Sequence, residues 1–286
     1  MNLNFWLIQA FNGISYGALL FLVGSGLSLI FGVMRIVNLS HGSYFLLGGY
    51  VALTVIWTTG SWLLALPVAA LAIALLGLAM ERVFLRPLGF DPLRQVLLTV
   101  GFAFLFQQAA LDIWSGNNFD INPPATLSTS VNVGGLYLPL YRVFMIAMAA
   151  VIGIALWLAM EKTRLGAAVR ATVDDAQMAR GIGIDTSRIS MLIFALGAFL
   201  AALGGVIGGA FLGIYPGLDF EMLPLAFAVV IIGGMGSLGG AAIGALAVGL
   251  ADNFGKALFP EISYFTLYAP MALILAVKPT GLFGRE

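Results

Sequence analysis

Charge, cysteine and histidine are scarce or absent in this 286-residue chain. The absence of cysteine excludes disulfide bonds and thiolate metal sites. The single histidine, His41, cannot build a histidine metal centre, and the scattered acids offer no clustered groups for a membrane-embedded enzyme. Charged residues make up only 9% of the chain, whereas a soluble domain has about 25%.

Apolar side chains fill the chain instead. They account for 61% of the residues, and the mean hydropathy is +1.03. A water-soluble core of this size could not bury so much apolar surface. The composition therefore predicts an all-α membrane protein that crosses the bilayer several times. The formal net charge is zero, so nothing in the charge balance indicates a nucleic-acid partner.

Apolar runs long enough to cross a bilayer occur along the whole chain. A spanning helix needs about 20 apolar residues for roughly 30 Å of hydrocarbon. By this measure we predict eight or nine spanning segments. The runs lie at 5–31, 42–58, 61–80, 94–114, 142–160, 190–213, 222–257 and 262–279. The run 222–257 is long enough for two passes. The glycine-rich stretch 233–240 divides it and must lie buried or at an interface, because irregular backbone cannot face lipid.

The first residues and the charged loops indicate how the chain is oriented in the membrane. The first residues lack the basic start of a cleaved signal peptide, so we expect the first segment to be kept as a transmembrane helix. Connection 81–94 carries three arginines and 161–189 carries five basic residues, whereas 115–141 has none. Because basic loops face the cytoplasm, we expect the N-terminus outside and the C-terminus in the cytoplasm.

Residues 161–189 form the one connection that resembles soluble protein, with nine of the 26 charged residues. Small residues recur there at three- and four-residue spacing from Ala168 to Gly183, so a helix would carry a small-residue stripe. Such a helix suits docking onto another protein, and a solvated helix that merely links two spans fits the composition equally well. The loop has no glycine-rich phosphate loop, so any nucleotide hydrolysis must be done by a partner.

Two apolar segments are interrupted in a similar way. The first break, 34–42, carries the most polar residues of the N-terminal third, and the second, 233–240, has five glycines among eight residues. Transporters often hold substrate near the midplane, where interrupted helices expose backbone groups. Close helix packing through glycine is the alternative. We predict a substrate pathway lined by Arg35, Asn38, Ser40, His41, Ser43, Gly233, Gly234 and Ser237.

Titratable residues inside the spans are few. His41 could carry a proton or gate a pathway, or it could satisfy carbonyls at a helix end, with Ser40 as the cap of the following helix. The candidate intramembrane acids are Asp112 and Asp252, each near the end of a span. Their scarcity disfavours an ion-coupled secondary transporter or channel, which stays as the less favoured alternative.

Three stretches together carry a family resemblance. They are 26–52 ("GLSLIFGVMRIVNLSHGSYFLLGGYVA"), 163–207 (beginning "TRLGAAVRATVDDAQMARGIGID") and 228–250 ("AVVIIGGMGSLGGAAIGALAVGL"). In the same order and spacing they resemble the membrane subunits of branched-chain amino acid ABC importers of the LivH type. The resemblance covers nearly the whole chain and implies a single transmembrane permease domain over residues 1–286.

The resemblance also implies partners and a mechanism. The family assembles a heterodimer of two related permeases, two cytoplasmic ATPases and a periplasmic or extracellular substrate-binding protein in the bacterial inner membrane. ATP and Mg²⁺ would bind to the ATPases, and this chain would bind no cofactor. It would move branched-chain or related small amino acids inward by alternating access. Related permeases also carry urea, short amides and aromatic acids, so these substrates stay open.

The resemblance further implies an ATPase-coupling helix within 161–189. Its residues would include Arg170, Asp174, Asp175, Arg180, Gly181 and Gly183. The general importer pattern of Glu-Ala-Ala, three residues and Gly is matched loosely by Asp175-Ala176-Gln177 with Gly181. Gly183 fits the LivH subfamily better, and which of the two glycines makes the turn stays open.

Overall fold

The computed structural model describes residues 2–89, 91–278 and 280–284, and this part of the chain is mostly helical. The helices are α1 (Leu3–Met34), α2 (His41–Thr59), α3 (Trp62–Met80), α4 (Pro92–Trp114), α5 (Leu140–Lys162), α6 (Arg164–Asp174), α7 (Ala176–Gly181), α8 (Thr186–Leu212), α9 (Leu218–Gly233), α10 (Leu238–Leu258) and α11 (Ser263–Val277). A π turn and two 3-10 turns, Glu81–Leu85, Arg86–Leu88 and Pro260–Ile262, complete the helical segments. The all-α class is confirmed.

A small antiparallel hairpin joins α4 to α5. Strands β1 (Ser130–Val133) and β2 (Leu136–Pro139) pair with Ser130 opposite Pro139. The sequence pattern does not predict this hairpin, because strands of four residues do not stand out from a polar loop.

Six helices in the described residues are long and apolar enough to cross a membrane. They are α1, α3 with its extension to Leu88, α4, α5, α8 and α10. The shorter or less apolar helices α2, α9 and α11 do not meet that criterion. A polytopic membrane protein is confirmed, and six is the number of spans that length and hydropathy alone establish.

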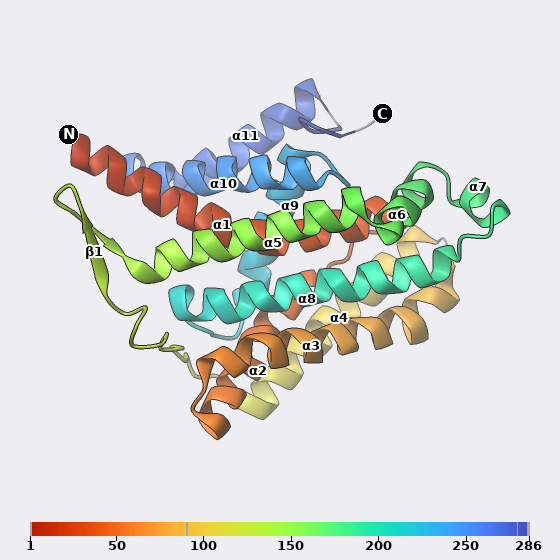
Figure 1. Ribbon diagram of the computed structural model, residues 1–286, viewed down its shortest axis with the longest axis horizontal. Coiled ribbons are helices and arrows are strands. Elements are labelled where there is room, and N and C mark those ends of the chain that lie inside the picture. The colour runs from red at the N-terminus through yellow and green to blue at the C-terminus, as the bar shows by residue number, and fades with distance from the viewer. Residues whose placement is uncertain (1, 90, 279, 285–286) are drawn as a thin grey trace.

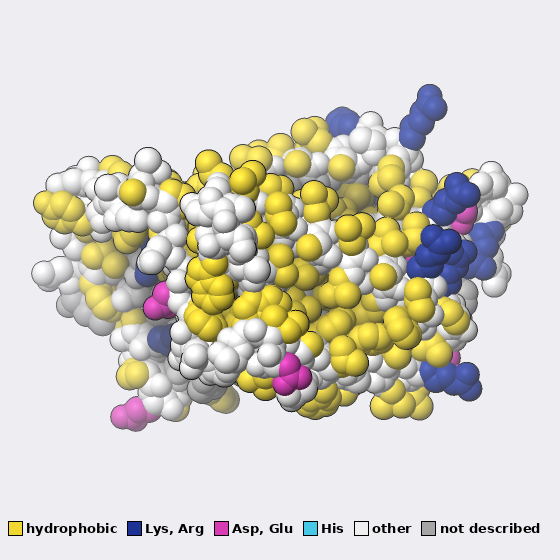
Figure 2. Space-filling model, turned by 90° about the horizontal axis from the view of Figure 1, so that it is seen from below, with side chains coloured by type: hydrophobic (Ala, Val, Ile, Leu, Met, Phe, Trp, Pro, Cys, Tyr) yellow, Lys and Arg dark blue, Asp and Glu magenta, His cyan; other side chains and the backbone are white. Residues whose placement is uncertain are grey.

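The long helices run roughly along one axis (Figure 1). Helices α1 and α8 pack against each other at the centre, with α10 against α1 and α3 against α8. The N-terminus and the hairpin lie at one end of the molecule, and α6 and α7 project from the other (Figure 1). Side chains of lysine and arginine gather at the α6–α7 end, while apolar side chains cover the middle (Figure 2).

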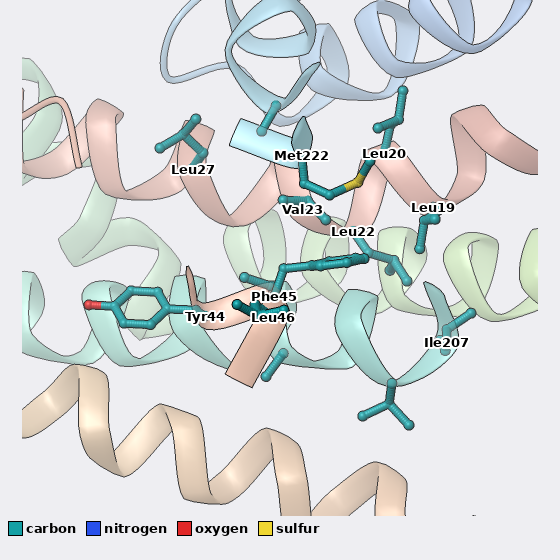
Figure 3. Close-up of a cluster of buried hydrophobic side chains, with 14 of the residues drawn as sticks. Leu19, Leu20, Leu22, Val23, Leu27, Tyr44, Phe45, Leu46, Ile207 and Met222 are labelled. Atoms are coloured by element: carbon teal, nitrogen blue, oxygen red, sulfur yellow. The ribbon is translucent and has the colours of Figure 1, made fainter. Parts of the chain in front are cut away.

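Large buried side chains gather near the start of α2. Near the start of α2, Tyr44 and Phe45 project in opposite directions, and Phe45 lies beside Leu22 and Val23 of α1 and Met222 of α9 (Figure 3). All five side chains are buried. The backbones of α2 and α8 come close here because a glycine of α8 faces α2.

Helices α2 and α8 touch through Gly205. A Cβ atom built on this glycine would lie 1.9 Å from the carbonyl oxygen of Phe45 and 3.0 Å from the amide nitrogen of Gly49. These are backbone atoms and cannot swing aside as a flexible side chain could. The α2–α8 contact therefore depends on a glycine at this position.

Candidate functional site

The first break folds back into the bundle. Helix α1 ends at Met34, and Arg35 turns the chain with a φ of 54° and an exposed side chain. Residues 35–40 are not helical, and at the start of α2 the ring nitrogen Nε2 of His41 lies 3.0 Å from the carbonyl oxygen of Val23. Val23 precedes the end of α1 by eleven residues, so this contact lies roughly 16 Å back along the helix axis.

Side chains along this break alternate between two environments. Ile36, Asn38 and Ser40 are buried, whereas Val37 and Leu39 are only partly so. An extended chain points successive side chains to opposite sides. Two of the predicted pathway residues, Asn38 and Ser40, therefore point into the packed core.

Asn38 and Ser40 stabilise the start of α2. The Asn38 side-chain oxygen accepts hydrogen bonds from the backbone N–H of Ser40 at 3.1 Å and from the Ser40 hydroxyl at 2.7 Å. Ser40 occupies the position before the helix, as the sequence indicated, but its side chain makes no capping bond to the helix. The turn is closed by Asn38 instead.

An apolar cavity of about 360 Å³, partly open to the surface, lies between the two breaks. Its lining residues are Leu27, Phe31, Val37, Leu39, Phe227, Val230, Ile231 and Met235. Val37 and Leu39 come from the first break and Met235 from the second. None of the predicted pathway residues lines this cavity. The predicted pathway residues were chosen for their polar side chains or glycine breaks. Hydropathy alone cannot separate the apolar side chains that line the cavity from those that face lipid.

The second break is short and tightly packed. Helix α9 ends at Gly233, and Gly234 and Gly236 adopt φ values of 105° and 80°. Ser237 then caps α10, because its hydroxyl oxygen accepts the backbone N–H of Gly240 at 3.0 Å. The interruption that the glycines predicted is therefore present, and it spans residues 234–237.

The last described residues complete this break. The backbone N–H groups of Leu282 and Phe283 donate to the carbonyl oxygens of Ile232 and Gly233, each at 3.0 Å. Carbonyl groups at a helix end have no partner within the helix. The chain beyond α11 thus returns to satisfy the end of α9.

The first turns of α2 and α9 meet through a buried acid. The Ser43 hydroxyl donates to Asp219 Oδ2 at 3.1 Å, and the two residues are 1% and 2% exposed. Asp219 was not among the predicted intramembrane acids, because it follows a polar Gly- and Pro-containing stretch that is typical of a loop. Of the acids named instead, Asp112 is exposed, and Asp252 is buried but paired with Lys256 at 2.7 Å.

The connection 161–189 contains two short helices in place of the single helix that the small-residue stripe predicted. Helices α6 and α7 meet at Asp175, which has extended backbone angles. The Asp175 Oδ1 atom accepts the backbone N–H groups of Gln177 at 2.8 Å and Met178 at 2.9 Å. An aspartate in this position is a favourable cap, and it interrupts the stripe.

Gly183 makes the turn after α7. It has a φ of 91°, its N–H donates to the carbonyl of Arg180, and the N–H of Ile184 donates to that of Ala179, both at 3.0 Å. This is the Schellman arrangement, in which glycine is the usual residue with positive φ. Gly181 is the last residue of α7 and has no positive φ.

The charged residues of the loop are held mainly by their own segment. Arg170 donates to the carbonyl of Met160, and the Arg180 Nε donates to the Thr186 hydroxyl at 2.7 Å. Asp174 is exposed. Two apolar side chains, Met178 and Ile182, are 66% and 70% exposed at the tip. Neither residue is among the predicted coupling residues, although apolar residues in a charged loop are a usable signal.

We expect Gly183→Ala to loosen the tip of the loop. A non-glycine residue with left-handed backbone costs about 1 kcal/mol, so the amide of Ile184 should exchange with solvent faster. Gly181→Ala is the matched control, because a Cβ there meets open space. Hydrogen–deuterium exchange on the purified protein compares the two, and equal exchange at Ile184 in both variants would refute this account of the turn.

Comparison with known proteins covers almost the whole chain. Residues 9–275 match the family model described as "Branched-chain amino acid transport system / permease component". The high-affinity branched-chain amino acid transport system permease protein LivH of Escherichia coli is 32% identical, covering 98% of this chain and 96% of LivH.

Two more distant relatives are also permease proteins of transport systems. The permease protein BraD of Pseudomonas aeruginosa, from a high-affinity branched-chain amino acid transport system, is 28% identical over 98% of this chain and 96% of its own. The autoinducer 2 import system permease protein LsrC of Escherichia coli is 29% identical over 63% of this chain and 54% of its own. No solved structure was found to match.

The full-length match agrees with the interrupted apolar helices and the protruding loop. The chain belongs to the family of permease components of branched-chain amino acid transport systems, and it is the membrane-spanning subunit of an ATP-binding-cassette importer, not an enzyme.

Proposed function

We propose that this chain forms half of the path through which an importer moves branched-chain or related small amino acids into the cytoplasm, with a second, related permease supplying the other half. The supporting observation is the cavity, at which two helix breaks meet within a chain that matches LivH over its full length. The path opens alternately to the two sides. Arg35 lies near its cytoplasmic mouth, and His41 and Ser43 lie deeper, as do Gly233, Gly234 and Ser237 around the second break.

The partners that complete the importer are two cytoplasmic ATPases and an external substrate-binding protein. The ATPases, which bind ATP and Mg²⁺, dock on α6 and α7 around residues 170–183, with Met178 and Ile182 as apolar anchors. Support comes from the exposure of these two side chains and from the basic character of that end (Figure 2). The binding protein docks at the opposite end, on residues 115–141 and on the turn 213–217 that precedes the buried start of α9.

The proposed topology is a single permease domain, residues 1–286, in the bacterial inner membrane. The α6–α7 end faces the cytoplasm, because basic loops stay on that side. The start of α1 lies at the other end, and residues 282–283 pack at the end of α9. An N-terminus outside and a C-terminus inside require an odd number of crossings. Nine segments satisfy this when α2, α9 and α11 join the six longer spans.

The apolar cavity disfavours two of the alternative substrate classes. Urea and short amides would lose hydrogen bonds to water on entering a site lined only by apolar side chains. Aromatic acids carry enough apolar surface and stay as the second candidate class.

Co-purification tests the proposed assembly. The chain is tagged in its native host, extracted in mild detergent, and its companions are identified by mass spectrometry. We expect a second permease and one or two ATPases with phosphate-binding loops. Recovery of this chain alone, under conditions that keep a known importer intact, would contradict the proposal and turn attention to ion-driven flux.

A further inference from the structure

A buried carboxylate with an unused oxygen lies where the first turns of α2 and α9 meet. Asp219 is 2% exposed, and its Oδ2 accepts the Ser43 hydroxyl. Its Oδ1 has no hydrogen-bond partner of good geometry and no ion pair includes Asp219 within the part of the chain that the structure describes, although the backbone N–H groups of Phe220 and Asp219 lie close to the carboxylate. A buried charge is costly unless donors or a cation balance it. The free oxygen therefore indicates a ligand.

A second buried acceptor belongs to the same turn of α2. His41 Nε2 faces the carbonyl oxygen of Val23 at 3.0 Å, and because a carbonyl only accepts, Nε2 must carry the proton. The other ring nitrogen, Nδ1, is then an acceptor, and it has no partner in the described residues. On a helix His41 and Ser43 point to faces about 200° apart, so Nδ1 is a separate acceptor. The anionic Asp219 alone suits a cation with several N–H donors, such as an ammonium group.

The two turns are held in direct contact by a glycine. A Cβ built on Gly42 would lie 2.3 Å from the backbone carbonyl oxygen of Asp219 and 3.1 Å from the Cβ of Leu223. Gly42 lies between His41 and Ser43, so the turn that carries both side chains packs on the start of α9.

The apolar cavity lies one to two helical turns from these groups. On α1, Leu27 lines the cavity and follows Val23 by one turn; on α9, Phe227 lines it and follows Asp219 by eight residues, about 12 Å along the helix axis. The cavity volume of about 360 Å³ leaves room for an aliphatic side chain. Buried acceptors and apolar space thus lie along the same three elements.

We propose that Asp219, oriented by Ser43, accepts the ammonium group of an amino acid whose apolar side chain extends toward the cavity. This inference rests on the proposed function and narrows its substrate class. A transported molecule carries a free ammonium group and an aliphatic side chain. Urea, short amides and aromatic acids without an ammonium group bind poorly.

The absence of cysteine from the chain provides a direct assay. Leu39→Cys introduces a single thiol at the cavity wall, and its rate of labelling by a maleimide is followed on this chain in the complex with its partner subunits. L-Leucine should slow the labelling, as should 3-methylbutylamine, which keeps the ammonium group. 4-Methylpentanoate, which keeps the side chain and the carboxylate but lacks the ammonium group, should not.

Substitution at Asp219 gives the second arm. In the Leu39→Cys background, Asp219→Asn should raise the half-protective leucine concentration about tenfold, the effect of one charge-assisted hydrogen bond. Ser43→Ala should raise the half-protective leucine concentration less, because it removes the hydrogen bond that orients Asp219 but keeps the carboxylate. Glu221→Gln is the matched control: this acid lies in the same turn but is exposed and bonded to the Tyr215 hydroxyl at 2.8 Å.

Two results would overturn the inference: unchanged leucine protection in Asp219→Asn, or protection by 4-methylpentanoate equal to that by leucine. If Asp219→Asn fails to assemble, the three-ligand comparison with Asp219 intact decides alone. A complex that imports leucine with ATP but shows no protection by leucine refutes this site while the proposed function stands. A complex that imports no amino acid with ATP refutes the proposed function itself.

Discussion

The Gly205→Ala variant is expected to yield almost no folded permease. The added methyl group would lie 1.9 Å from the Phe45 carbonyl oxygen, so α2 and α8 must move apart. Such overpacking in a close-packed core costs about 1–3 kcal/mol, or more when only backbone can move. Separation would also expose Phe45, which is 1% exposed in the native bundle.

The matched control for this substitution is Gly101→Ala. Gly101 lies within α4, and a Cβ there meets nothing within 4 Å. Alanine also favours the helix, so this variant should be extracted in the wild-type amount. Size-exclusion chromatography of the detergent extract measures both. Wild-type recovery of monodisperse Gly205→Ala protein would show that the α2–α8 contact is looser than described.

Placing charge on the tip of α7 is expected to uncouple the permease from its ATPases. Met178 and Ile182 are 66% and 70% exposed, so Met178→Asp with Ile182→Asp should leave the fold intact. A docked interface would bury these anchors, and desolvating two unpaired carboxylates there is strongly unfavourable. ATP-driven uptake and co-purification of the ATPases should both fall by an order of magnitude or more.

Met178→Leu with Ile182→Val serves as the control for that double variant, because it keeps the apolar surface. It should retain both assembly and uptake. If the aspartate pair assembles and transports like the control, the tip of α7 is not an ATPase contact, and the proposed docking surface must be sought elsewhere among the basic loops.

Hydropathy predicted the helices closely because lipid imposes their length and polarity. The run 142–160 became α5 (Leu140–Lys162), and the long run 222–257 divided at its glycines into α9 and α10. A glycine-rich break can be recognised in the sequence from its composition alone. Helix ends of this kind can be predicted without knowing which helices become neighbours.

The inner surface of the bundle was harder to predict because it depends on those neighbours. Asp219 reads as part of an outer loop, and only its contact with Ser43, 176 residues earlier, reveals its burial. Val37 and Leu39 look like any apolar residues until the break is seen to run back along α1. The glycine that makes the turn after α7 could likewise be identified only from the backbone: Gly183 has a positive φ and Gly181 does not, although both fit the sequence pattern of the loop.

ATP-dependent uptake in proteoliposomes tests most directly the claim that this chain is the membrane part of an ATP-driven importer. The complex is reconstituted with its binding protein outside and ATP inside, and entry of labelled L-leucine is followed after ionophores collapse all ion gradients. We predict uptake that requires ATP and the binding protein and is unaffected by the ionophores. Uptake by this chain alone that follows a proton or sodium gradient and ignores ATP would contradict the claim.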